Sequence, residues 1–179
     1  QTAFNQMFDF IVEHVKDAVL CAYNGSRFDH HFLVEEAIKR GIKVPDLLIV
    51  DGNAILGGNL LSNKFWDIAR FTQSSLKDAC YSFKVPEHIT KGEFDHTKMN
   101  SWDDVDKYEL EVRKYLQNDV LSMMWIVDKL GTTMYERFKI WICDFLTIPS
   151  IAYSLWTTTV KSPVEVRYDF EKYTMMKDA

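Results

Sequence analysis

Apolar residues near the start of the chain recur every three or four positions. They are Phe4, Met7, Phe8, Ile11, Val12 and Val15. This spacing predicts a helix with one apolar face. The continuous apolar run AVLCAY at 18–23 then predicts a short strand that is buried on both faces of a sheet. HFLVEEAIKRG follows as a second helix, which we expect to end at Gly41 because glycine suits the turn after a helix.

The middle of the chain predicts strands first and helices afterwards. The runs LLIV, ILGGNL and KFWDIARF are separated by turn-forming residues and predict two or three strands. Ser75 stands where a helix N-cap is expected, and LKDACYSF follows it. From Ser101, SWDD opens a helical stretch that should pass Met124, with breaks near Gly131 and Pro149. This alternation predicts an α/β fold with a mixed sheet.

Composition limits the class of protein. The chain has 179 residues, 47% of them apolar, which suits one globular core. Its net charge of −5 argues against nucleic-acid binding over the whole surface, but a local basic groove remains compatible with it. Cys21, Cys80 and Cys143 lie far apart in apolar stretches and indicate free thiols in a reducing compartment. Neither a secretory signal nor an apolar run of 18 residues is visible, so we expect an intracellular protein without a membrane partner. The sequence does not specify which compartment.

Two acidic positions are candidates for chemistry. Asp29 follows the AVLCAY strand, where α/β folds place ligand-binding groups. Alternatively, Asp29 is the N-cap of the next helix. Tyr115 and Asp119 are four residues apart in a helical stretch and so share one helix face, either as part of a site or on a solvated side. His30 and His31 have no cysteine or third histidine at ligand spacing, which argues against zinc.

Together these segments resemble a known family. N-x3-F-D from Asn24 to Asp29 and Y-x3-D from Tyr115 to Asp119 resemble the second and third exonuclease motifs of B-family DNA polymerases. KGEF, starting at Lys91, resembles the K-x2-hydrophobic motif of the protein-primed branch, found in phages, linear plasmids, adenoviruses and self-synthesising transposons. Asp67 followed by SL at 75–76 resembles the D…SL segment of the same branch.

The resemblance implies an RNase-H-like (DnaQ-like) exonuclease fold, a mixed sheet flanked by helices, which removes nucleotides from the 3′ end of single-stranded DNA. Residues 1–160 would form this domain, and 161–179 would lead to the polymerase palm. The family's first motif, D-x-E, does not occur upstream of Asn24, so the domain is expected to be N-terminally truncated and to degrade DNA little on its own. DFE, from Asp169 to Glu171, is an alternative source of these carboxylates in a permuted fold.

The resemblance also implies a role for each motif residue. Two Mg²⁺ or Mn²⁺ ions would stabilise the attacking and leaving oxygens, with Asp29 and Asp119 as metal ligands. The remaining roles are water orientation by Tyr115, charge stabilisation by Lys91, a grip on the DNA 3′ end by Asn24 and Phe28, and contact with the same strand by Ser75 and Leu76. The implied partners are single-stranded DNA, the remainder of the polymerase chain and a terminal priming protein.

Two other functions stay open. One is a non-catalytic interaction or structural module that kept this fold. The other is an RNase-H-like nuclease with another substrate. The aromatic residues of the C-terminal third are interpreted as core, or alternatively as a surface for a polymerase domain; they are Trp125, Tyr135, Phe138, Trp141 and Phe145.

Overall fold

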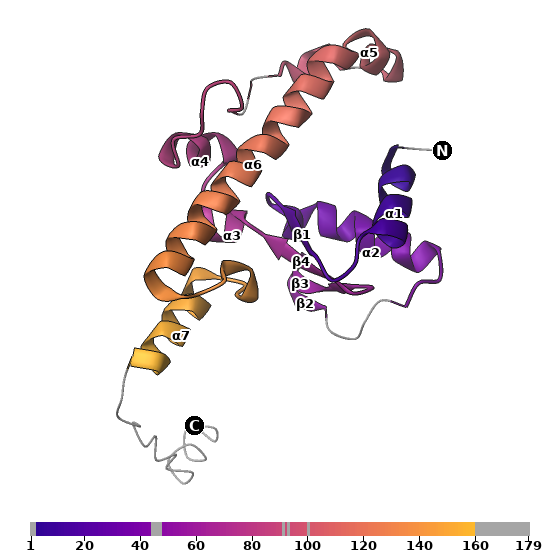
Figure 1. The fold of residues 1–179 in the computed structure, drawn as a ribbon. Helices are drawn as coiled ribbons and strands as arrows, with labels where there is room; N and C mark the ends of the chain where they lie inside the picture. Colours follow the sequence, from indigo (N-terminus) through magenta and orange to yellow (C-terminus); the bar gives the residue numbers. More distant parts are fainter. Residues whose placement is uncertain (1–2, 44–47, 91, 93, 100, 160–179) are drawn as a thin grey trace, which may run out of the picture.

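The computed structural model describes residues 3–43, 48–90, 92, 94–99 and 101–159 (Figure 1). Lys91 and the segment 161–179, with Asp169 and Glu171, lie outside the described residues. In chain order the elements are α1 (Ala3–His14), β1 (Val19–Ala22), η1 (Gly25–Arg27), α2 (Asp29–Lys39), β2 (Ile49–Asp51), β3 (Ala54–Leu60), β4 (Asn63–Asp67), α3 (Ala69–Thr72), α4 (Leu76–Ser82), η2 (His96–Lys98), α5 (Trp102–Lys107), α6 (Glu109–Phe138), η3 (Ile142–Asp144) and α7 (Ile148–Thr159).

The sheet is mixed, as the alternation of elements predicts. Its strand order is β1-β4-β3-β2, with β1 parallel to β4 and the other neighbours antiparallel. Within the described residues β1 pairs on one side only, and Val19 is 41% exposed. The predicted strand is therefore an edge strand among the described residues. Its side chains reach the apolar clusters on both faces, Leu20 on one and Cys21 on the other, but none is fully buried. An apolar run marks a strand that can be covered on both faces, but it does not identify the neighbour that covers it.

Helices cover both faces of the sheet. Neighbouring side chains of β4 point to opposite sides, because strand side chains alternate. Phe65 packs into one core cluster with residues of α1 and α2, such as Phe8 and Leu33. Trp66 packs into a second cluster with residues of α4 and α6, such as Ile126. The result is a three-layer α/β arrangement, with α1 and α2 on one side and α6 on the other (Figure 1).

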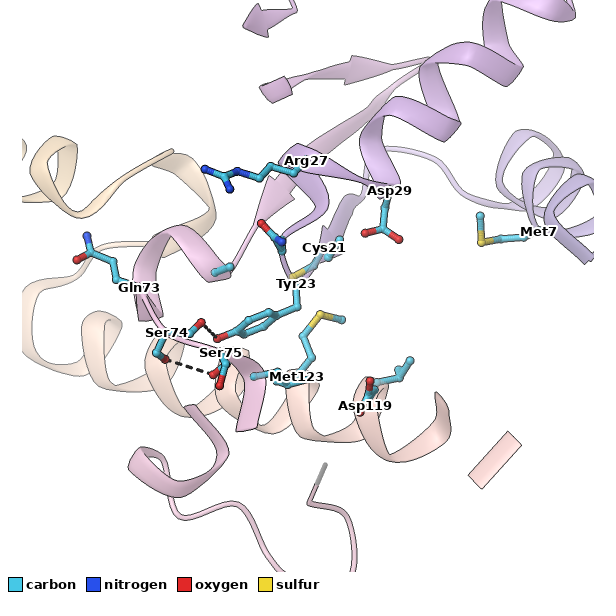
Figure 2. A pocket seen from close by; sticks show the side chains of 15 residues that line it. Met7, Cys21, Tyr23, Arg27, Asp29, Gln73, Ser74, Ser75, Asp119 and Met123 are labelled. Atoms are coloured by element: carbon cyan, nitrogen blue, oxygen red, sulfur yellow. Dashed lines mark hydrogen bonds between the residues drawn. The ribbon is translucent and has the colours of Figure 1, made fainter. Parts of the chain in front are cut away.

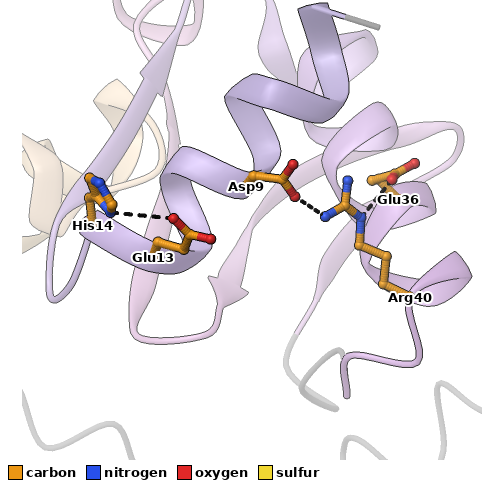
Figure 3. A network of polar contacts seen from close by, with 5 residues as sticks. All are labelled: Asp9, Glu13, His14, Glu36 and Arg40. Atoms are coloured by element: carbon orange, nitrogen blue, oxygen red, sulfur yellow. Dashed lines mark hydrogen bonds and ion pairs between the residues drawn. The ribbon is translucent and has the colours of Figure 1, made fainter. Parts of the chain in front are cut away.

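An ion-pair network joins α1 to the end of α2. The Arg40 guanidinium donates to Asp9 of α1 and, at 2.7 Å, to Glu36 one turn earlier in α2 (Figure 3). It also lies over the Phe8 ring, 4.7 Å from the centroid. The chain then turns through Gly41, whose φ of 67° is left-handed, so the predicted helix end is confirmed.

The long helix differs from its prediction in one respect. The capping box at Ser101 and a helix that passes Met124 are confirmed. However, α6 continues through Gly131 and ends before Lys139, which has a φ of 58°. The predicted break at Gly131 is therefore wrong. Pro149 lies in the first turn of α7, where its missing N–H needs no helical partner.

The chain after α6 is held by side chains of β4 and of the short helix α3 that follows it. Trp66 Nε1 donates to the carbonyl of Phe145 at 2.9 Å, and Arg70 Nε donates to that of Leu146 at 3.1 Å. Most of the aromatic residues interpreted as core are instead more than a third exposed, namely Trp125, Tyr135, Phe138 and Trp141. None of the helices within the described residues has the length and apolar character needed to span a membrane.

Candidate active site

A cavity of about 950 Å³ lies where four segments meet. They are the end of β1, the turn into α2, the loop before α4, and the middle of α6. The residues that line it are Met7, Cys21, Ala22, Tyr23, Asn24, Arg27, Asp29, Ala69, Gln73, Ser74, Ser75, Leu76, Asp119, Val120 and Met123. Five of the eight predicted site residues are in this set, although up to 95 positions separate them in the sequence.

Asp29 is the first residue of α2, and its exposed side chain lines the cavity (Figure 2). The helix N-cap is Phe28, and no side chain caps this end. The interpretation of Asp29 as the N-cap is therefore wrong. Its position in the first turn of α2 suits a carboxylate, because the helix dipole is positive there. The same position leaves its oxygens accessible for other ligands.

Asp119 lines the cavity from α6, across the open space from Asp29 (Figure 2). Its side chain is half-buried. Tyr115 lies one turn earlier on α6, as the spacing predicts, but it lines a separate, smaller depression with Asn118. There its ring packs against that of Phe94, with centroids 5.6 Å apart. The structure thus brings the two carboxylates to one cavity and leaves Tyr115 at its side.

The residues predicted to hold DNA occupy different environments. Asn24 lines the cavity and has a left-handed backbone, with φ of 64°. Ser75 accepts a hydrogen bond from the Asp78 N–H at 3.1 Å, so its prediction as a helix N-cap is confirmed. Leu76 is 8% exposed and belongs to a core cluster, so most of its surface supports the cavity wall. Phe28 is 56% exposed and lies outside the residues that line the cavity.

Sequence reasoning did not identify two further residues of this cavity. Tyr23 lines it, and its hydroxyl bonds to the Thr72 hydroxyl at 2.7 Å and to the Ser74 carbonyl at 2.8 Å. Arg27 is the one cation among the described residues that line it. The signal for Arg27 was its place inside the Asn24–Asp29 motif, at a position that the motif leaves unspecified.

Cys21 has an altered acidity in this environment. Burial, and then the charge of nearby Asp67, raises the pKa of its thiol to about 12. A thiol with this pKa stays protonated near neutral pH. Since the thiolate is the form that attacks electrophiles, this raised pKa disfavours Cys21 as a nucleophile.

The donor set suits a hard divalent cation. The carboxylates of Asp29 and Asp119 and the amide oxygen of Asn24 are the kinds of ligand that Mg²⁺ and Mn²⁺ take. Within the described residues, no three histidine, cysteine, aspartate or glutamate side chains are grouped closely enough to hold a metal ion. The cavity offers two carboxylates in all, and Mg²⁺ is usually bound through one or two carboxylates with water in the other positions.

A comparison with known proteins found one similar protein that is described as a polymerase. Over 193 aligned positions the chain is 25% identical to a probable DNA polymerase of Agaricus bitorquis, and the match covers 86% of this chain. The chain spans about a quarter of that polymerase, 24% of its length. No family model matches the sequence, and no solved structure matches it. The similarity therefore relates most of this chain to part of a DNA polymerase.

Proposed function

We propose that this chain is the 3′→5′ exonuclease domain of a protein-primed B-family DNA polymerase. It would act on the 3′ end of single-stranded DNA by metal-assisted hydrolysis. The observation that carries the proposal is the shared cavity of Asp29 and Asp119, 90 positions apart in the sequence. The similarity to a probable DNA polymerase supports the part of the proposal that relates this chain to a DNA polymerase. The parts specific to the protein-primed branch, including a terminal priming protein as partner, rest on the segments at Lys91 and 67–76.

Each residue in or near the cavity has a specific role in the proposed reaction. Asp29 and Asp119 would hold the divalent ions, which supply charge stabilisation to the attacking and leaving oxygens. Arg27 and the Asn24 amide would bind the phosphate and sugar of the terminal nucleotide from the β1 side. Exposed Phe28 would stack on a base. Tyr115 would orient water, although it lines the neighbouring depression rather than the main cavity. Lys91, which lies outside the described residues, would stabilise charge at the scissile phosphate.

We further propose that a strand from the remainder of the polymerase completes the sheet at β1. The outer edge of β1 is unpaired within the described residues, so its backbone groups can form another ladder. Apolar depressions flank this edge on both faces. One is lined by residues that include Met7 and Leu33, and the other by residues that include Val127 and Trp141. A strand there would end beside Asp29 and could add the carboxylates of the first motif.

Calorimetric titration with Mn²⁺ tests the metal site. We expect weak binding by the unmodified chain, and at least tenfold weaker binding by Asp29→Asn and by Asp119→Asn, because each substitution removes an ionised ligand. Asp128→Asn is the matched control, since Asp128 is an exposed acid on the same helix α6. Equal affinity in all four proteins would contradict the proposal and favour the non-catalytic module.

A time course on single-stranded DNA labelled at its 3′ end tests the activity. We expect slow degradation at most, because residues that act as a set in a two-metal site fail together when part of the set is missing. Any activity should disappear in Asp119→Asn. Rapid degradation that depends on Asp119 would contradict the need for a further strand, and Asp169→Asn with Glu171→Gln would then test the permuted site. Equal degradation of RNA would favour a nuclease with another substrate.

A further inference from the structure

We propose that Asp67 is the positioning residue of this site, which fixes the turn that carries Asn24 and Asp29. This inference rests on the proposed function. The hydrogen bonds from which it is argued do not depend on that function. Asp67 is the last residue of β4 and pairs in the sheet with Ala22, the last residue of β1. Its side chain is 2% exposed.

The Asp67 carboxylate accepts three backbone hydrogen bonds. Oδ1 accepts from the N–H of Asn24 at 2.8 Å and from that of Ala69 at 3.0 Å. Oδ2 accepts from the N–H of Ser26 at 3.0 Å. Two of the three donors belong to the turn between β1 and α2. The end of one strand thereby holds the turn that follows its neighbour, 41 to 43 positions earlier in the sequence.

This task requires a carboxylate. Both of its oxygens accept, and hydrogen bonds to an ionised acceptor are stronger than those between neutral groups. An asparagine at position 67 could accept at one atom only, and its NH₂ would then face an N–H donor. A buried donor left without an acceptor is costly. The substitution Asp67→Asn keeps the shape of the side chain and removes one of the acceptors that hold the turn.

The turn has an irregular backbone, and its internal bonds, from Arg27 N–H to the Asn24 carbonyl and from Phe28 N–H to the Gly25 carbonyl at 3.1 Å each, do not tie it to β4. Asn24 is left-handed without being glycine, and Phe28 has φ of −133° and ψ of −80°, outside the regular regions. Asp29 follows Phe28 directly. The direction in which the Asp29 carboxylate leaves α2 therefore depends on how residues 24–28 are held.

The sheet itself does not depend on Asp67. The β1–β4 pair is closed by backbone bonds at both ends, from Ile68 N–H to the Ala22 carbonyl at 3.1 Å and from Lys64 N–H to the Ala18 carbonyl at 2.8 Å. Helix α2 is held on the sheet by His30, whose Nδ1 bonds to the Ile55 carbonyl at 2.9 Å. Loss of the Asp67 charge should therefore disturb the turn and leave the fold intact.

The test compares Asp67→Asn with Asp51→Asn, which changes the exposed carboxylate at the end of β2. Backbone amide spectra of uniformly ¹⁵N-labelled protein report the turn, circular dichroism reports the fold, and Mn²⁺ titration reports the site. In Asp67→Asn we expect shifted and faster-exchanging amides at 24–29, unchanged helical signal, and metal affinity lower by about tenfold or more, as for other residues that orient a metal ligand. Asp51→Asn should change none of these.

Three results would overturn the positioning role. The first is an Asp67→Asn spectrum in which the amides of 24–29 do not move. The second is a change spread over the whole sheet, which would make Asp67 a general stabilising residue. The third is a displaced turn with unchanged Mn²⁺ affinity. If the unmodified chain binds no Mn²⁺, the proposed function fails, and the amide spectra still decide whether Asp67 holds the turn.

Discussion

The imidazole of His30 stacks on the ring of Phe65, with ring centroids 4.8 Å apart and planes inclined by 13°. His30 is 1% exposed and sits under the turn that leads into α2. Because Asp29 is its neighbour in the sequence, this contact places the start of α2, and the candidate metal ligand with it, at a fixed point over β4. The packing beneath the site is therefore as important for its geometry as the residues that face the cavity.

The substitution Gly25→Ala should be strongly destabilising. A Cβ atom at Gly25 would lie 2.5 Å from the Ala22 Cβ and 2.9 Å from His30 Nε2. Neither neighbour is the end of a long flexible side chain, so the backbone of the turn must move. We expect a loss of about 2–3 kcal/mol in the free energy of unfolding, measured with urea. Gly92→Ala is the control, since nothing lies within 4 Å of a Cβ there. Similar effects of the two substitutions would contradict this packing.

Gly131→Ala should instead increase the free energy of unfolding. Gly131 lies inside α6, and a Cβ there would meet Ile142 at 3.8 Å, an ordinary contact distance. Alanine favours helix over glycine by about 0.5–1 kcal/mol, so thermal and urea unfolding should show a gain of that size. Gly41→Ala provides the contrast, because Gly41 has a φ of 67°. A loss of stability in Gly131→Ala would mean that α6 is interrupted there after all.

Phe28→Ala should weaken the binding of single-stranded DNA more than that of duplex DNA. Phe28 is 56% exposed next to Asp29, and stacking on a base requires a base face that a duplex hides. Loss of one stacked base corresponds to about 1–3 kcal/mol of binding free energy. Fluorescence anisotropy with labelled oligonucleotides measures both affinities. Phe10→Ala is the matched control, with 57% exposure on α1. Equal losses for Phe28→Ala on both substrates would exclude the stacking role.

The raised pKa of Cys21 predicts a dependence of stability on alkaline pH. An unperturbed thiol has a pKa of 9.0, and that of Cys21 in the fold is about 12. Between these values the folded state keeps a proton that the unfolded state releases, so this contribution to stability is present below pH 9 and declines toward pH 12. The stability difference between the unmodified chain and Cys21→Ala should therefore shift against the unmodified chain as the pH rises above 9. A constant difference would show that the thiol is not perturbed.

Features that depend on a few consecutive residues could be predicted from the sequence. Features that depend on which elements pack against each other could not. Ser75 as a cap and Gly41 as a helix end follow from short-range backbone chemistry, and both are confirmed. The edge position of β1 and the continuity of α6 at Gly131 depend on what packs alongside, which a single sequence does not specify. The two motifs predicted that Asp29 and Asp119 form one site. Both residues line one cavity, and their function stays a prediction. That Arg27 and Tyr23 also line this cavity became visible only from the structure.

The point at which α6 is anchored determines how far each of its residues would move if the helix tilted. Its buried residues are Ser122 and Ile126, and the Ser122 hydroxyl donates to the Ile89 carbonyl at 2.7 Å. The N-terminal half of the helix extends beyond the sheet (Figure 1). At 1.5 Å per residue, Asp119 lies ~4.5 Å from this anchor and Tyr115 ~10 Å. A tilt of the helix about Ser122 would therefore have its pivot close to Asp119. Such a tilt would move Tyr115 more than twice as far as Asp119.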